Sequence, residues 1–174
     1  MLMRKLYIYL ICILLPGFTM SGFVRAQNEE EFPPPVTRIM FVFDASQSMI
    51  GRWESDTKFN IATRLFTNIL DSLRGTPNLE LALRLYGHQK YYPPGDCDDT
   101  ELKVPFGKDN MDKIKLALEA VSPKGITPIA HSLSEAANDF SPCDNCRNVV
   151  VLITDGIEEC GGDPCLVSTE LQQK

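Results

Sequence analysis

The sequence is poor in basic residues. Its 17 lysines and arginines are outnumbered by 23 aspartates and glutamates, so the formal net charge is −6. Proteins that bind a phosphate backbone are normally basic, and anionic lipid surfaces likewise attract cationic segments. We therefore expect neither nucleic acid nor a membrane surface among the partners of this protein.

Two familiar signatures of catalytic and metal centres are also missing. The chain has no G-x-S-x-G sequence, which excludes the nucleophile elbow of Ser-His-Asp hydrolases. Its C-x-x-C sequence at 143–146 has no second copy and no nearby histidine, and a zinc site would require both. The composition is globular, with 44% apolar and 23% charged residues, and the length suits about one domain.

The first 26 residues have the layout of a secretory signal peptide. The cations Arg4 and Lys5 precede the apolar run L-Y-I-Y-L-I-C-I-L-L, and V-R-A ending at Ala26 supplies the small residues that a signal peptidase prefers. We expect cleavage after Ala26, export to the periplasm, cell surface or medium, and no membrane insertion of the mature chain. The alternative is an uncleaved anchor, because the 19 uncharged residues between Lys5 and Arg25 approach the minimum for a spanning helix.

Cleavage would leave an acidic linker and one folded domain. Residues 27–35 (Q-N-E-E-E-F-P-P-P) are too polar and too rich in proline to pack, so the domain is expected over 36–174. Loss of the three cations of the leader would leave 14 cations and 23 anions, a net charge of −9. We therefore expect the mature protein to be an exported acidic domain.

Strands and helices alternate along the domain. Apolar runs predict strands buried on both faces over 36–43 and 148–154, alternation predicts a strand over 79–86, and Pro105 limits a short edge strand over 102–106. Helical spacing predicts four helices: from the N-cap Asp56 to Gly75, over 110–121 capped by Asp109, over 128–140 with Thr127 as N-cap, and over 164–173. This order predicts an α/β fold with a doubly wound, Rossmann-like, mostly parallel sheet and helices on both faces.

Five cysteines remain after cleavage, in a compartment where disulfides persist. We expect a loop disulfide between Cys143 and Cys146. The flexible G-G-D-P turn between Cys160 and Cys165 would allow a second local bridge. Because the number is odd, one thiol is free or pairs outside this sequence, with Cys97 as the candidate. The sequence does not determine the pairing.

Oxygen-bearing side chains gather where the two buried strands end. D-A-S-Q-S follows the first strand directly, Asp155 follows the strand that ends at Thr154, and Thr127 opens a helix between them in the sequence. If the two strands are neighbours at the point where the strand order reverses, these side chains converge on one crevice. Two carboxylates and three hydroxyls suit Mg²⁺ or Mn²⁺ rather than zinc or copper. The candidate ligands are Asp44, Ser46, Ser48, Thr127 and Asp155.

These motifs resemble a known family. D-A-S-Q-S resembles the D-x-S-x-S motif of von Willebrand factor type A domains, and G-I-T-P-I and L-I-T-D-G resemble the family's Thr and Asp loops, in its order and spacing. The resemblance covers residues 37 to about 174 and implies a metal-ion-dependent adhesion site. It implies that Ser46, Ser48 and Thr127 are direct or near-direct ligands and that Asp44 and Asp155 act mainly through water. An acidic side chain of a protein partner would take the open coordination position.

Two further stretches resemble a bacterial subgroup of exported members: D-G-I-E-E-C-G-G-D-P-C, and Y-G-H followed by D-C-D-D-T-E-L. The family fold normally continues with two more strands and a helix beyond the strand that precedes Asp155. The resemblance therefore implies a domain that is truncated at its C-terminus and lacks its last strands.

We expect a binding module and not an enzyme. F-V-F-D-A-S also resembles the first motif of haloacid-dehalogenase-type phosphotransferases, with Asp44 as the nucleophile. Ser46 stands where that family needs a general acid, and a serine hydroxyl holds its proton too tightly for that role near neutral pH. The alternative within the binding class is a structural or sensory domain whose metal site is vestigial.

Two histidines and two glutamates are not expected to be ligands of the cation. His131 lies one helical turn after Thr127, yet a surface or packing role is expected for it and for His88. Glu158 and Glu159 are expected to form a solvated loop, and the alternative is that they add negative potential near the cation.

Overall fold

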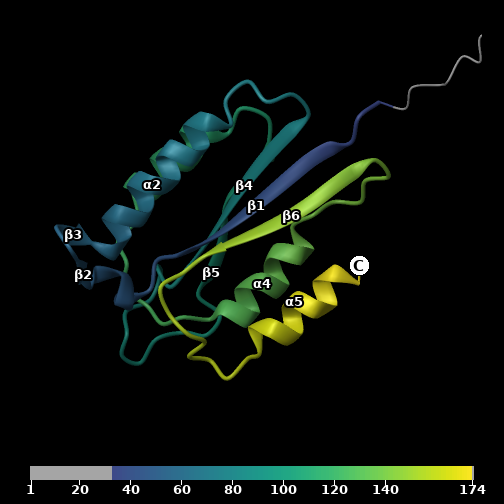
Figure 1. Ribbon diagram of the computed structural model, residues 1–174. Helices are drawn as coiled ribbons and strands as arrows, with labels where there is room; N and C mark the ends of the chain where they lie inside the picture. Colours follow the sequence, from purple (N-terminus) through teal and green to yellow (C-terminus); the bar gives the residue numbers. More distant parts are fainter. Residues whose placement is uncertain (1–32, 174) are drawn as a thin grey trace, which may run out of the picture. The chain divides into compact units, whose positions relative to one another are not determined.

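A mixed sheet of four strands forms the centre of residues 33–173, the part of the chain that the computed structural model describes (Figure 1). The strands are β1 (Val36–Asp44), β4 (Leu79–Tyr86), β5 (Thr100–Gly107) and β6 (Cys146–Ile153), in the order β5-β4-β1-β6. β1 pairs in parallel with β4 and β6, and β4 pairs antiparallel with β5. The predicted mostly parallel sheet is confirmed. The predicted signal peptide and residues 27–32 of the linker lie outside the described residues.

Helices cover both faces of the sheet, as predicted (Figure 1). α2 (Lys58–Ser72) and α3 (Met111–Glu119) pack on one face, and α4 (Ile129–Asn138) and α5 (Pro164–Gln172) pack on the other. Between β1 and α2 the chain forms the short helix η1 (Gln47–Ile50) and a hairpin of β2 (Arg52–Trp53) and β3 (Asp56–Thr57). None of the helices in residues 33–173 has the length and apolar character needed to cross a membrane.

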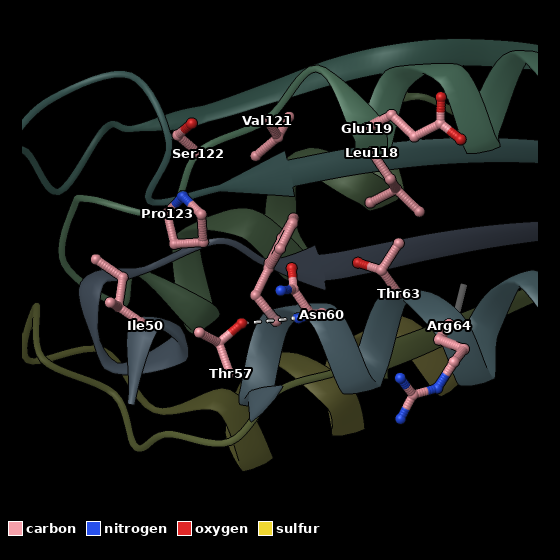
Figure 2. A pocket seen from close by; sticks show the side chains of 11 residues that line it. Ile50, Thr57, Asn60, Thr63, Arg64, Leu118, Glu119, Val121, Ser122 and Pro123 are labelled. Atoms are coloured by element: carbon pink, nitrogen blue, oxygen red, sulfur yellow. Dashed lines mark hydrogen bonds between the residues drawn. The ribbon is translucent and has the colours of Figure 1, made fainter. Parts of the chain in front are cut away.

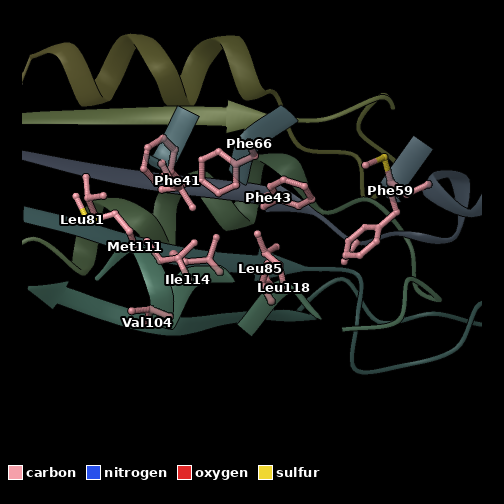
Figure 3. Close-up of a cluster of buried hydrophobic side chains, with 14 of the residues drawn as sticks. Phe41, Phe43, Phe59, Phe66, Leu81, Leu85, Val104, Met111, Ile114 and Leu118 are labelled. Atoms are coloured by element: carbon pink, nitrogen blue, oxygen red, sulfur yellow. The ribbon is translucent and has the colours of Figure 1, made fainter. Parts of the chain in front are cut away.

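β1 is buried on both faces because its apolar residues alternate between two cores. Phe41 and Phe43 point toward α2 and α3, whereas Met40 and Val42 point toward α4. The ring of Phe41 meets that of Phe66 edge-on, with 4.6 Å between the centroids (Figure 3). Burial of each such side chain stabilises the fold by roughly 1.5–3 kcal/mol. The packing of β1 therefore fixes the position of the loop that follows its C-terminal end.

β6 is less buried than its apolar sequence predicts. Its residues from Val149 to Ile153 are only half-buried. Within residues 33–173, β6 pairs with β1 along one edge and with no strand along the other. The neighbouring face of α2 exposes about half of Leu65 and of Ile69, and a cavity of about 470 Å³ lies between α2 and β6.

Two of the predicted helix caps are wrong by one residue. Thr57, and not Asp56, is the N-cap of α2, because its hydroxyl accepts a hydrogen bond from the backbone N–H of Asn60 at 3.2 Å. Asn110, and not Asp109, precedes α3, and its amide donates to the carbonyls of residues 81 and 105 instead of capping the helix. The α5 prediction is confirmed, with Asp163 as its N-cap.

One buried ion pair joins the sheet to the end of α4. Arg84 on β4 is 5% exposed, and its guanidinium donates two hydrogen bonds to the carboxylate of Asp139, at 2.9 and 3.0 Å. It donates a third to the hydroxyl of Thr100 on β5, at 3.1 Å. The contact therefore holds the C-terminal end of α4 against β4 and β5.

We predict that Asp139→Ala lowers the free energy of unfolding by about 3–5 kcal/mol, because it leaves the Arg84 charge buried without a partner. Urea denaturation followed by circular dichroism measures this change. The matched control is Asp71→Ala, which removes an exposed carboxylate paired with Arg74 and Lys115. Water screens such pairs, so the control should leave the urea midpoint nearly unchanged. Equal losses in the two variants would contradict the prediction.

Candidate functional site

The predicted neighbouring strands do meet at the point where the strand order reverses. β1 and β6 pair side by side with Phe43 opposite Ile153. The connection through α2 leads from β1 to β4 on one side, whereas β6 lies on the other side. The loops that follow β1 and β6 therefore emerge together at the carboxyl edge of the sheet (Figure 1).

Three predicted side chains form a continuous chain of hydrogen bonds across these loops. The hydroxyl of Ser46 lies 2.9 Å from that of Ser48. The Ser48 hydroxyl donates to Oδ1 of Asp155 at 2.8 Å. Ser46 is buried, whereas Ser48 lies at the surface. The structure therefore brings residues 107 positions apart in the sequence into direct contact.

Asp44 lies beneath this chain and is fully buried. Its Oδ1 accepts a hydrogen bond from the backbone N–H of Ser46 at 2.8 Å, and its Oδ2 accepts one from the hydroxyl of Thr154 at 2.7 Å. Both carboxylate oxygens therefore have a donor, which a buried charge requires. Thr154 was not among the predicted site residues, although it directly precedes Asp155 in the L-I-T-D-G motif.

Tyr86 stands next to Asp44, at the paired position on β4. It is fully buried, and its hydroxyl has no hydrogen-bond partner among residues 33–173. Burial raises the pKa of the Tyr86 phenol well above its usual value, and the negative charge of Asp44 raises it further. Tyr86 therefore remains protonated and adds no charge to the site.

Thr127 reaches the same place from the loop before α4. Ser46 forms an isolated parallel bridge with Gly125, and the N–H of Gln47 donates to the Gly125 carbonyl at 2.8 Å. A Cβ atom built on Gly156 would lie 3.7 Å from the hydroxyl of Ser48 and 3.7 Å from that of Thr127. All five predicted residues thus lie together, and we call Asp44, Ser46, Ser48, Thr127 and Asp155 the oxygen cluster.

The loops around the oxygen cluster approach one another so closely that a glycine is required. Gly87 follows β4 with φ at +68°. A Cβ atom there would lie 2.6 Å from the carbonyl oxygen of Ile126 and 2.8 Å from Cα of Ser46. No larger residue fits at this position, so Gly87 lets the loops after β1 and β4 and the loop before α4 meet.

Glu158 and Glu159 lie in a loop, as predicted, and Glu159 is exposed, but both carboxylates also accept hydrogen bonds from backbone N–H groups. Glu158 accepts a hydrogen bond from the N–H of Ala130 at 2.7 Å, and Glu159 accepts one from the N–H of Thr127 at 3.0 Å. The prediction of Thr127 as N-cap is wrong. α4 begins at residue 129 with Pro128 as N-cap, and Glu158 satisfies the first-turn N–H of Ala130 that a local cap would otherwise serve.

The disulfides tie the same loops together, and one differs from the expected local bridge. Cys160 pairs with Cys97, 63 positions away, and not with Cys165. The bond joins the loop after β4 to the loop after Asp155. Cys143 and Cys146 pair as predicted. Within residues 33–173, the free thiol is the exposed Cys165, so the expectation of Cys97 as the odd cysteine is wrong.

A lysine that the sequence analysis did not select contacts the oxygen cluster. Nζ of Lys58, the first residue of α2, lies 2.5 Å from Oδ2 of Asp155. Neither histidine contacts the cluster. His88 pairs with Glu101 at 2.9 Å, and His131 lies 3.8 Å from Asp98.

Any cation at this edge would need hydroxyl oxygens among its ligands. Residues 33–173 contain no group of three or more histidine, cysteine, aspartate or glutamate side chains placed to hold a metal. The oxygen cluster supplies two carboxylates and three hydroxyls. Such a donor set is chemically suited to a hard cation such as Mg²⁺ or Mn²⁺.

Two cavities lie near α2, and only one reaches the oxygen cluster. The larger, about 580 Å³, lies between the start of α2 and the end of α3 (Figure 2). Thr57 at the end of β3 lines it together with Asn60 and Thr63 of α2, and no member of the oxygen cluster does. The cavity of about 470 Å³ between α2 and β6 is lined by Trp53 and Lys58 and ends at Asp155.

Comparison with known sequences identifies one family. A model of the von Willebrand factor type A domain matches residues 39–158. "Uncharacterized protein YwmC" of Bacillus subtilis (strain 168) is 31% identical over 166 residues, which cover 92% of this chain and 71% of that protein. YwmD of the same organism is 32% identical over 133 residues, which cover 74% of this chain and 58% of that protein.

Solved structures share the fold. BatB from Bacteroides thetaiotaomicron has a TM-score of 0.63 at 22% identity, covering 79% of this chain and 62% of that chain. Proximal thread matrix protein 1 from the mussel byssus, in a structure with a zinc-occupied MIDAS motif, has a TM-score of 0.60 at 22% identity, covering 80% and 34%. The vWF domain of the type V pili tip protein Mfa5 from Porphyromonas gingivalis has a TM-score of 0.54 at 18% identity, covering 73% and 40%. The chain spans less than two thirds of each of these structures.

We predict that removal of the Cys97–Cys160 disulfide, by serine substitution of both cysteines, destabilises the protein more than removal of Cys143–Cys146. Chain-entropy arithmetic gives about 4 kcal/mol for the first loop and about 2 kcal/mol for the second, because the first closes a far longer segment. Guanidinium denaturation measures both losses.

The pairing itself is checked by alkylation of the unreduced chain and peptide mapping. Cys165 should be labelled, whereas Cys97 and Cys160 should be protected. Labelled Cys97 with protected Cys165 would show that the local bridge forms instead.

Proposed function

Because this chain belongs to the von Willebrand factor type A family, we propose that it is an exported domain that binds a divalent cation, Mg²⁺ or Mn²⁺, at the oxygen cluster. Through that cation it binds an acidic group of a protein partner, in an adhesion-type role. The proposed ligands are the five residues of the cluster, with the serine and threonine hydroxyls closest to the cation and the carboxylates behind them.

The observation that carries this proposal is the hydrogen-bonded chain from Ser46 through Ser48 to Asp155, above the buried carboxylate of Asp44. A serine hydroxyl has one proton and two lone pairs. Ser48 directs its proton to Asp155, so a lone pair of its oxygen is free to face a cation. Hydrogen bonds from Ser46 and Thr154 hold both carboxylate oxygens of Asp44. Its negative charge is therefore fixed in position below the hydroxyls.

The choice of cation follows from the donor atoms. Zinc sites in proteins favour cysteine and histidine ligands, and the oxygen cluster contains neither. Mg²⁺ and Mn²⁺ favour carboxylate, hydroxyl and water oxygens. The zinc bound by the mussel byssus protein supports a divalent cation at such a motif, and the donor set favours Mg²⁺ or Mn²⁺ here.

The expected partner presents a carboxylate. The two carboxylates of the cluster nearly balance a divalent cation, and when bound the ion would supply the dominant positive centre at contact distance. An acidic side chain is therefore attracted in spite of the chain's net charge of −6. Structural similarity to a pilus tip protein and to a byssus thread protein supports this role and an extracellular site of action.

We propose binding without catalysis. A phosphotransferase that uses Asp44 as nucleophile needs an acid two residues later, and Ser46 holds that position with its hydroxyl bonded to Ser48. Both histidines are engaged with other acidic residues. Phosphatase and esterase activities should accordingly remain at background.

We predict that Asp44→Ala abolishes the binding of Mg²⁺ to the full chain and, with it, capture of the partner. Removing the buried carboxylate takes away half of the cluster's negative charge and frees the Ser46 loop. Isothermal titration calorimetry with MgCl₂ measures the first effect, and a pull-down from the native cell envelope with and without a chelator measures the second. Asp71→Ala, which removes a remote aspartate, is the control.

Capture at full strength in the presence of chelator would contradict the mechanism. Mg²⁺ binding that is millimolar or weaker in the wild-type chain would favour the alternative of a structural or sensory domain with a vestigial site.

A further inference from the structure

The ammonium group of Lys58 forms an ion pair with the carboxylate of Asp155, one of the proposed cation ligands. Its Nζ lies 2.5 Å from Oδ2 of Asp155, while Oδ1 of the same carboxylate accepts the proton of Ser48. Both oxygens of Asp155 are therefore engaged within the chain. Of the two groups that hold Asp155, only Lys58 carries a positive charge.

The backbone of Lys58 is fixed beside the oxygen cluster. Its N–H donates to the carbonyl of Gly51 at 2.9 Å, at the point where α2 begins. A Cβ atom on Gly51 would lie 3.6 Å from Cε and 3.9 Å from Nζ of Lys58, so the side chain runs along the loop that carries the serines. The side chain of Lys58 is 37% exposed and that of Asp155 is 16% exposed. The ammonium group is thus anchored near the site but keeps a route to solvent.

Lys58 is also the one basic side chain within residues 33–173 that forms an ion pair with either aspartate of the oxygen cluster. The ammonium of Lys58 and the two carboxylates together carry a net charge of −1, whereas the carboxylates alone carry −2. A divalent cation that enters must displace the ammonium or tolerate its repulsion at short range. Either outcome weakens cation binding.

We propose that Lys58 is a built-in competitor for the divalent cation at Asp155, which sets the cation affinity of the site and keeps the loops closed until the cation arrives. This inference rests on the proposed function and deepens it. In the absence of cation, Lys58 supplies the positive charge that holds the loop after β6 against the loop after β1. When the cation binds, the ammonium is released toward solvent.

The experiment compares the wild-type chain with Lys58→Met, which keeps the unbranched apolar part of the side chain and removes its charged end. Trp53 is the chain's one tryptophan, and it lines the same cavity as Lys58 and Asp155. Quenching of its fluorescence by Mn²⁺ therefore reports occupancy directly, and isothermal titration with MnCl₂ and MgCl₂ gives the affinity. We expect Lys58→Met to bind both ions at least about tenfold more tightly than wild type.

Lys115→Met is the matched control. Lys115 also pairs with an aspartate, Asp71, at 2.6 Å, but remote from the oxygen cluster, so its loss should leave both titrations unchanged. Lys58→Ala provides a second variant in case the methionine fills the vacated space, and thermal melts without cation verify that each variant is folded.

Each result separates the two proposals. Equal cation affinities in wild type, Lys58→Met and Lys58→Ala would overturn the competitor role and leave the proposed function intact. Weaker binding in the Lys58 variants would overturn it by showing that the ammonium supports the site. Absence of binding in every variant would overturn both proposals together.

Discussion

The buried carboxylate of Asp44 is the constraint around which the carboxyl edge of this sheet is organised. A charge without solvent contact must be satisfied by donors from the protein, and here the donors come from two different strand ends. Ser46 on the loop after β1 provides one and Thr154 at the end of β6 provides the other. Satisfying Asp44 therefore fixes the two loops against each other and places Ser48 within hydrogen-bonding distance of Asp155.

The sequence was sufficient for the succession of strands and helices and for the polar residues at the strand ends, because each depends on local patterns. That β1 and β6 are neighbours at the reversal point was an assumption of the sequence analysis, and the structure supplies the pairing. Apolar runs locate β1 and β6, and the polar residues that follow them mark the carboxyl ends. The burial of β6 was overestimated, because an apolar run does not reveal whether a strand has a neighbour on both edges.

The contacts that join distant segments were not predictable in the same way. Glu158 and Glu159 bind N–H groups about 30 residues earlier, and no local spacing distinguishes such acids from a solvated pair. Likewise, Cys160 pairs with Cys97 because the loop after β4 folds over toward the loop after β6, whereas the sequence only shows that Cys165 is near in the chain. Lys58 is an ordinary helix-terminal lysine until the fold places it beside Asp155.

The Cys97–Cys160 bond also decides what a single proteolytic cut would achieve. It closes a covalent ring that includes β5, α3, α4 and β6. A single cleavage of the backbone between residues 98 and 159 leaves the two fragments joined, so the strands that flank the cut cannot diffuse apart. β1 lies outside that ring, and the backbone that passes through α2 and β4 joins it to the ring. A cleavage in the exposed β2 hairpin would leave this central strand joined to the rest of the sheet by packing and hydrogen bonds alone, so a cut in the short segment between β1 and α2 is not covered by the disulfide.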